Sequence, residues 1–210
     1  MTKGLIVFAR EPVPGKVKTR LASSIGDLAA SKQYEDMLQN VLKTTRQLSD
    51  VETVIFWDCE VESLPLLAEK YLCCSLFQSP GNLGQRMQAA FEKMFSSGFE
   101  LCCIIGSDAP DLPHSYIMEA FDLLEMQQAD AVFGPSMDGG YYLLGVRQVW
   151  PQLFAHIPWS SVDVLHQSLA AACDSGLTTT LLPVWQDIDT LEDLHAFQER
   201  NRLTPTMETT

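Results

Sequence analysis

Four cationic side chains gather in one short loop of a strongly acidic chain. Arg10, Lys16, Lys18 and Arg20 lie within eleven residues, which also contain Gly15. The whole chain has 14 Lys and Arg against 27 Asp and Glu, a formal net charge of −13. Cationic groups beside a glycine turn bind phosphate oxygens through charge-assisted hydrogen bonds. The loop is therefore a candidate phosphate-binding segment, and the alternative is a solvated basic loop.

Several better-defined catalytic patterns are missing from the sequence. Arg10 stands where a Walker A motif has its first glycine, and Val17 stands where that motif has Ser or Thr after its lysine. The chain has no G-x-G-x-x-G and no G-x-S-x-G, and its four histidines show no metalloprotease spacing. The sequence therefore gives no support for a P-loop, a dinucleotide-binding fingerprint or a serine–histidine enzyme.

An aspartate follows the most apolar strand predicted for the chain. Asp108 comes shortly after residues 101–105, Leu-Cys-Cys-Ile-Ile, and it lies too early to cap the helix expected from His114. A carboxylate at such a strand end faces the ligand cleft of an open α/β sheet, where a hard cation can join it to phosphate. Asp111 stands just before Leu-Pro at that helix start, and an N-cap role is favoured over a metal role there.

A second acidic segment precedes the last predicted helix. Thr190 and Asp193 have the spacing of a capping motif, so part of this acidity belongs to the helix start. Asp189 is then free to point elsewhere, and Asp187 is its neighbour at one residue's distance.

Two glycine-containing segments complete the set of candidates. Asp138 precedes two glycines, which is typical of a hairpin turn, so its alternative role is purely structural. Gly81 and Gly84 open a helix after the third predicted strand, where glycines permit close approach of the backbone to a ligand.

Strands and helices alternate along the chain, which predicts a three-layer α/β fold with helices on both faces of the sheet. We expect one domain over residues 1–202 and a polar tail over 203–210. The strand at 141–146 is either parallel or antiparallel to its neighbours. The apolar patterns place strands at residues 5–9, 51–57, 74–77, 101–105, 130–133, 141–146 and 178–182, and helices at 27–48, 63–72, 84–95, 114–126, 162–173 and 190–201.

Composition excludes several classes of partner. A net charge of −13 repels nucleic-acid backbones and anionic membranes, so we expect neither as a partner. No apolar run approaches the roughly 20 residues that cross a bilayer, and the first residues lack a signal-peptide pattern. We therefore expect a cytoplasmic protein. The six cysteines have no zinc or C-x-x-C spacing, which favours reduced thiols that are buried as small hydrophobes.

The candidate segments occur in an order that resembles a known bacterial family, the radical-SAM/selenodomain-associated transferases, often labelled glycosyltransferase A-like. The resemblance covers residues 3–200 and places the chain with the nucleotide-diphospho-sugar transferase superfamily. The motifs that carry it are Phe8-Ala-Arg10-x-Pro-x-Pro-Gly15-x-Val-Lys18-Thr-Arg20-Leu21, Leu83-Gly84-x-Arg86-Met87, Gly106-Ser-Asp108-x-Pro110, Asp138-Gly-Gly-Tyr141, Trp159-Ser160 and Asp187-Ile-Asp189-Thr190.

This resemblance implies a GT-A-like (Rossmann-like) fold with a mixed, mostly parallel central sheet. It also implies a nucleotide site, a Mg²⁺ or Mn²⁺ site on Asp108 and Asp189 with Asp187 as the substitute for Asp189, and catalytic roles for Lys18 and Asp138. The resemblance places Asp138 where related proteins contact the acceptor. The nucleotide and phosphate contacts that it implies are Ala9, Arg10, Gly15, Lys18, Arg20, Leu83, Gly84 and Gln85.

Two departures from the family pattern keep the reaction type open. Pro12 and Pro14 replace the Gly-Gly pair that nucleotide-transferring relatives carry in the first loop, and the segment around Asp108 contains no Asp-x-Asp. The first hypothesis is a metal-dependent glycosyltransferase that uses a nucleotide sugar and a small-molecule acceptor. The alternative is a nucleotidyltransferase that releases pyrophosphate from a nucleoside triphosphate, which the dense basic loop favours. A nucleotide-binding protein without turnover ranks third, because both carboxylates are present.

Overall fold

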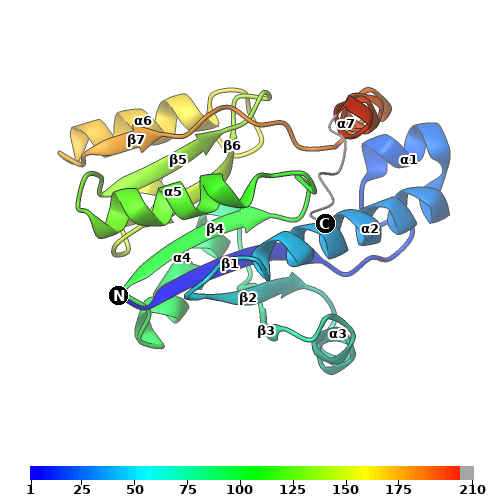
Figure 1. The fold of residues 1–210 in the computed structure, drawn as a ribbon, viewed down its shortest axis with the longest axis horizontal. Helices are drawn as coiled ribbons and strands as arrows, with labels where there is room; N and C mark the ends of the chain where they lie inside the picture. Colours follow the sequence, from blue (N-terminus) through cyan, green and yellow to red (C-terminus); the bar gives the residue numbers. More distant parts are fainter. Residues whose placement is uncertain (204–210) are drawn as a thin grey trace, which may run out of the picture.

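A seven-stranded sheet forms the middle layer of the molecule, whose computed structural model describes residues 1–203. The strands lie in the order β3-β2-β1-β4-β6-β5-β7 (Figure 1). Their bounds are β1 Lys3–Arg10, β2 Val51–Asp58, β3 Cys74–Phe77, β4 Leu101–Gly106, β5 Ala131–Pro135, β6 Tyr141–Val146 and β7 Thr179–Leu181.

The sheet is mixed, and β6 runs against its neighbours. Strand β1 pairs in parallel with β2 and β4, whereas β6 is antiparallel to both β4 and β5. The β1 register places Phe8 opposite Phe56 on β2 and Gly106 on β4, so these strands end at the same edge. The predicted central position of the 101–105 strand and the α/β fold class are both confirmed.

Helices cover both faces of the sheet, because most of them present one apolar stripe to it. Two short 3₁₀ segments, η1 Val61–Ser63 and η2 Pro151–Leu153, complete the elements. The helices are α1 Thr19–Ile25, α2 Asp27–Thr45, α3 Leu64–Tyr71, α4 Leu83–Ser96, α5 His114–Glu125, α6 Val164–Asp174 and α7 Leu191–Leu203.

The two faces have separate hydrophobic cores. Leu38 of α2, Leu67 of α3 and Phe121 of α5 pack on one face of the sheet, and Figure 1 shows α2 and α5 crossing it. Phe91 of α4 and Ala172 of α6 pack on the other face. This arrangement confirms the predicted three-layer architecture.

A third, smaller core joins the two ends of the chain. Leu21 of α1, Met37 of α2 and Leu194 of α7 are buried together with Ile188. Figure 1 shows α1 and α7 beyond the edge at which β1 and β2 end. Helix α1 is absent from the sequence prediction, which treated residues 10–20 as one loop. The small core therefore holds the basic loop and the acidic segment before α7 at the same edge of the sheet.

The cysteines follow the prediction only in part. All six are free thiols, and Cys102 and Cys103 are buried in β4. Burial raises the pKa of the Cys102 thiol to about 12. The expectation of burial is wrong for Cys74 and Cys173, which are exposed. Cys74 begins the edge strand β3, and Cys173 lies in the last turn of α6, so neither position is enclosed by a second layer.

The described part of the chain ends in helix α7. Leu203, with which the predicted polar tail begins, is the last residue of α7. The rest of that predicted tail, residues 204–210, lies outside the described residues. Within residues 1–203, no helix combines the length and the apolar character that a bilayer crossing requires.

Candidate functional site

Lys18 lies between two carboxylates at the carboxyl edge of the sheet. Its Nζ is 3.1 Å from Asp108 Oδ2 and 2.7 Å from Asp189 Oδ1, and its side chain is 5% exposed. Burial acts to lower the pKa of Lys18, but the two carboxylates outweigh it and the pKa is raised above its ordinary value. The single positive charge of Lys18 thus reduces the repulsion between the two carboxylates and offsets one of their two negative charges.

Backbone and capping bonds bring these two carboxylates together. Ile188 N donates a 2.9 Å hydrogen bond to Asp108 O, which ties the loop before α7 to the loop after β4. Asp193 Oδ2 accepts hydrogen bonds from the backbone of Asp189 and Thr190, at 3.1 and 2.8 Å. Thr190 Oγ1 in turn accepts from Asp193 N at 3.2 Å. The predicted cap is confirmed, and it orients the backbone that carries Asp189.

The N-cap prediction for Asp111 is wrong. Helix α5 begins at His114 with Pro113 at its N-cap, so Asp111 lies too far back to reach the first helical N–H groups. Its Oδ2 instead pairs with Arg200 Nε at 3.0 Å, and its Oδ1 accepts from Trp185 Nε1 at 3.2 Å. A half-buried guanidinium is the stronger partner, and the pair holds α7 against the β4 loop.

The paired carboxylates fit a hard divalent cation that completes its shell with other oxygens. Asp108 and Asp189 converge on one point, which Lys18 occupies in this structure. In the described part of the chain, no group of three or more His, Cys, Asp and Glu forms a metal cage. Mg²⁺ is commonly held by one or two carboxylates together with water and substrate phosphate, and this donor set matches that pattern.

Asp187 faces a different neighbour. Burial raises the pKa of its carboxyl to about 6, and the charge of Asp138 adds more to that rise than either Asp189 or Asp108 does. Asp187 forms no ion pair with Lys18, whereas Asp189 does. The geometry therefore favours Asp189 over Asp187 as the partner of Asp108.

These groups line a cleft of about 720 Å³ at the carboxyl edge. Three predicted residues do not line it. Gly15 lies in a turn with φ +80°, Gln85 caps α4, and Gly84 packs against the Trp159 ring. The predicted residues that do line the cleft are Ala9, Arg10, Lys18, Arg20, Leu83, Asp108, Asp138, Asp187 and Asp189.

The cations of the basic loop differ in what they contact. Lys16 Nζ lies 3.8 Å from Glu60 Oε1, and Lys16 does not line the cleft. Arg20 Nη1 lies 3.7 Å from Asp189 Oδ2, and its side chain is 75% exposed. Arg10 and Arg20 line the cleft with exposed side chains, whereas the Lys18 side chain is buried between two carboxylates.

A polar group at the β2 end of the cleft was missed by the sequence analysis. Arg86 Nη1 donates to Gln78 Oε1 at 2.8 Å and lies 3.5 Å from Asp58 Oδ2. Gln78 Nε2 donates to Ala9 O at 3.1 Å. Arg10 Nε also lies 3.5 Å from Asp58 Oδ2. The signal in the sequence was Arg86 itself, a charged residue next to the apolar stripe of α4.

Asp138 belongs to the tight hairpin between β5 and β6. Its Oδ1 accepts hydrogen bonds from Gly140 N, at 2.9 Å, and from Ser136 Oγ. Gly139 has φ +90°, and a Cβ there would lie 2.1 Å from Val162 O. The expected turn is therefore present, and the segment 159–164 packs directly on it. The same carboxylate also lines the cleft, so a structural role and a chemical one are compatible.

The close approach expected at Gly84 is made by a side chain of this protein. A Cβ at Gly84 would lie 2.5 Å from ring atoms of Trp159. The Trp159 ring also meets Tyr141 edge-on, with centroids 6.5 Å apart. Gly84 therefore holds Trp159 at the cleft wall.

We expect Gly84→Ala to lower the free energy of unfolding by about 1–3 kcal/mol, because the added methyl overpacks the Trp159 ring. Urea unfolding measures the change. In a Trp159→Ala background the same substitution should be neutral or stabilising, since the clash is gone and Ala favours the helix. An equal loss in both backgrounds would show that the ring is not the cause.

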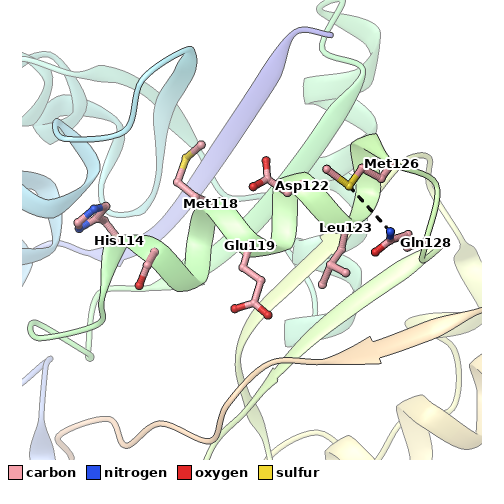
Figure 2. A pocket seen from close by; sticks show the side chains of 8 residues that line it. His114, Met118, Glu119, Asp122, Leu123, Met126 and Gln128 are labelled. Carbon is pink, nitrogen blue, oxygen red and sulfur yellow. Dashed lines mark hydrogen bonds between the residues drawn. The ribbon is translucent and has the colours of Figure 1, made fainter.

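A second hollow, of about 400 Å³, lies along the outer surface of α5 and is lined by Met118, Glu119 and Asp122 among others. In Figure 2 these side chains project from one helix, and Gln128 Nε2 approaches Met126 Sδ at 3.9 Å. None of the predicted site residues lines it. The convergence of opposite charges makes the carboxyl-edge cleft the candidate site.

Comparison with known proteins gives a family and a fold. Residues 41–161 match the family described as uncharacterized protein conserved in bacteria (DUF2064). No curated protein matches the chain. A crystal structure of a proposed nucleotide-diphospho-sugar transferase from Desulfovibrio desulfuricans is 30% identical, with a TM-score of 0.91 over 100% of this chain and 91% of that one.

Two more distant structures share the fold. A cytidylyltransferase from Leptospira borgpetersenii is 15% identical with a TM-score of 0.62, over 100% of this chain and 90% of that chain. The glucosyl-3-phosphoglycerate synthase of Mycobacterium tuberculosis, solved with Mn²⁺, uridine diphosphate and glucosyl-3-phosphoglycerate, is 10% identical with a TM-score of 0.55, over 96% of this chain and 77% of that chain. At these identities the likeness shows the GT-A-like fold.

Proposed function

The chain belongs to the family of uncharacterized proteins conserved in bacteria (DUF2064), and from this premise we propose that it is a metal-dependent transferase with a nucleotide-activated donor, in the first place a nucleotide-diphospho-sugar glycosyltransferase. The observation that carries the proposal is the convergence of Asp108, Asp189 and Lys18 at the carboxyl edge of the sheet, beside the exposed Arg10 and Arg20. The 30% identical transferase structure supports it. The link to the radical-SAM/selenodomain-associated branch stays a prediction.

In this proposal each part of the cleft has its own task. Asp108 and Asp189 hold Mg²⁺ or Mn²⁺, and the bound ion supplies charge that offsets the diphosphate leaving group. Lys18 and Arg20 add donors for phosphate oxygens, and the wall at Ala9 and Leu83 accommodates the nucleoside. Asp138 orients the acceptor hydroxyl and accepts its proton.

Nucleotidyl transfer is the alternative, and the geometry weakens the argument for it. The dense basic loop favours a triphosphate only if its four cations are available in the cleft. Lys16 does not line the cleft, and Lys18 is buried between two carboxylates. Arg10 and Arg20 line the cleft with exposed side chains but each also lies within 4 Å of a carboxylate, so the loop offers less positive charge than its composition suggests.

Product analysis tests the proposal and separates the two reactions. The protein is incubated with Mn²⁺ and, in turn, with each nucleoside triphosphate and each common nucleotide sugar, together with a mixture of small hydroxyl acceptors. We expect release of a nucleoside diphosphate from a nucleotide sugar. Release of pyrophosphate would establish the alternative, and metal-independent binding of nucleotide without turnover would leave a binding protein.

We expect Arg20→Ala to weaken nucleoside-diphosphate binding by about 1–3 kcal/mol, the contribution of a charge-assisted hydrogen bond. Calorimetric titration in Mn²⁺ measures it, and added salt should weaken parent binding more than variant binding. Lys16→Ala is the matched control, because its side chain is 67% exposed in the same loop and does not line the cleft. Equal affinity in the parent and both variants would show that the loop is a solvated surface that does not bind the nucleotide.

A further inference from the structure

In the described residues, the cations that line the cleft and its two carboxylates without an ion pair belong to different segments of the chain. The sheet order places β1 and β2 on one side of β4, and the β5–β6 hairpin on the other side. Arg10 ends β1, and Arg86 Nη1 lies 3.5 Å from Asp58 Oδ2 at the end of β2, so both cations line the first side. We call the second side the hairpin half, and define it by the cleft residues of the hairpin, Ser136 and Asp138, by the segment 159–164 and by Asp187.

The hairpin half carries negative charge without a compensating cation. Asp138 and Asp187 both line it and interact electrostatically. Among the residues that the structure describes, no Lys, Arg or His forms an ion pair with either carboxylate. The rest of its lining consists of three serines, one aromatic ring and two valines: Ser136, Ser160, Ser161, Trp159, Val162 and Val164, with Val162 exposed.

We propose that the hairpin half takes an uncharged, hydroxyl-bearing group and rejects groups that carry phosphate or carboxylate. This inference rests on the proposed function and concerns the group that the nucleotide donor carries, which would lie in the hairpin half next to the acceptor hydroxyl that Asp138 orients. A carboxylate or phosphate placed there meets two acidic groups and no cationic donor, which is how sites reject the wrong partner. A hydroxyl group instead donates hydrogen bonds to those carboxylates.

The same walls explain why the accepted group is a polyol or sugar. Such a ring has many O–H donors for the carboxylates and serine oxygens, and a C–H face that can lie on an aromatic ring. Trp159 is held in place for this by Gly84 and Tyr141. The diphosphate then stays with the cations of the other half.

The first stage of the test is independent of the acceptor. Uridine, guanosine, cytidine and adenosine diphosphates are titrated into the protein with Mn²⁺, and the one that binds tightest is chosen. Its conjugates with glucose and with glucuronate, which differ by one carboxylate, are then compared by calorimetry. We expect the glucuronate conjugate to bind at least tenfold more weakly than the glucose conjugate.

A cation introduced at the rim tests whether the negative charge of the hairpin half causes the preference for the glucose conjugate. Val162→Lys adds a cation to the hairpin half at a side chain that is 75% exposed, and it should reduce the glucose-over-glucuronate ratio at least threefold. Val61→Lys is the matched control: this valine is 70% exposed in η1 and does not line the cleft. The control should leave the ratio unchanged.

Each outcome decides between the two proposals. Equal or tighter binding of the glucuronate conjugate by the parent overturns the inference while nucleotide binding still supports the proposed function. An unchanged ratio in Val162→Lys overturns the charge argument in the same way. If no nucleoside diphosphate binds in the presence of Mn²⁺, the proposed function itself fails, and the inference fails with it.

Discussion

Transfer activity should fall at least about 100-fold in the Asp108→Asn variant, because the amide keeps the shape of the carboxylate but is a far weaker ligand for a divalent cation. The part of nucleotide binding that depends on Mn²⁺ should disappear with it. Folding should survive: Lys18 keeps its 2.7 Å contact with Asp189, so no buried ammonium is left without a partner. Calorimetry with and without Mn²⁺ measures binding, and thermal unfolding should show a Tm within a few degrees of the parent.

Asp36→Asn is the control for Asp108, because it is the same substitution at an exposed position of α2 outside the cleft. It should leave activity and metal-dependent binding unchanged. If Asp108→Asn kept metal-dependent binding equal to that of the parent, the metal site would have to be placed elsewhere. Loss of both properties in the two variants alike would indicate a general electrostatic effect.

The second large effect is expected at the hairpin. Asp138→Asn should keep nucleotide and metal binding but lose most of the transfer activity, whichever transfer reaction takes place. The amide oxygen can still accept the bonds from Gly140 N and Ser136 Oγ, so the turn is preserved. The amide cannot accept the proton of an acceptor hydroxyl. Nucleotide titration and product release, measured on the same folded preparation, separate the two functions.

Ser136→Ala is the control for the turn, because it removes one donor to Asp138 and leaves the carboxylate in place. A purely structural role for Asp138 predicts that both variants behave alike and keep activity. Full activity of Asp138→Asn would show that Asp138 has only a structural role in the turn. Tyr141 and Trp159, which also line the cleft, would then be the next candidates for contact with the acceptor.

Local patterns were sufficient for the layers of the fold. The apolar run at 101–105 has no polar face, so only a strand covered on both sides accommodates it, and β4 lies between β1 and β6. The reciprocal bonds of Thr190 and Asp193 also follow from spacing alone, because a cap involves residues three apart. Helix α1 was missed because its seven residues follow a loop rich in Pro and Gly.

By itself, the sequence determined which residues could do chemistry: a strand-end aspartate, a basic loop and an acidic segment before the last helix. Only the tertiary structure decided how they pair. Lys18 and Asp189 are 171 residues apart, so no periodicity links them, and they meet because the small core of α1, α2 and α7 closes the two chain ends over one sheet edge. Asp111 shows the converse, since the distant Arg200 supplies a stronger partner than the nearby helix start. Local spacing encodes caps and strands, whereas the pairing of these charges depends on long-range packing that brings them to one edge of the sheet.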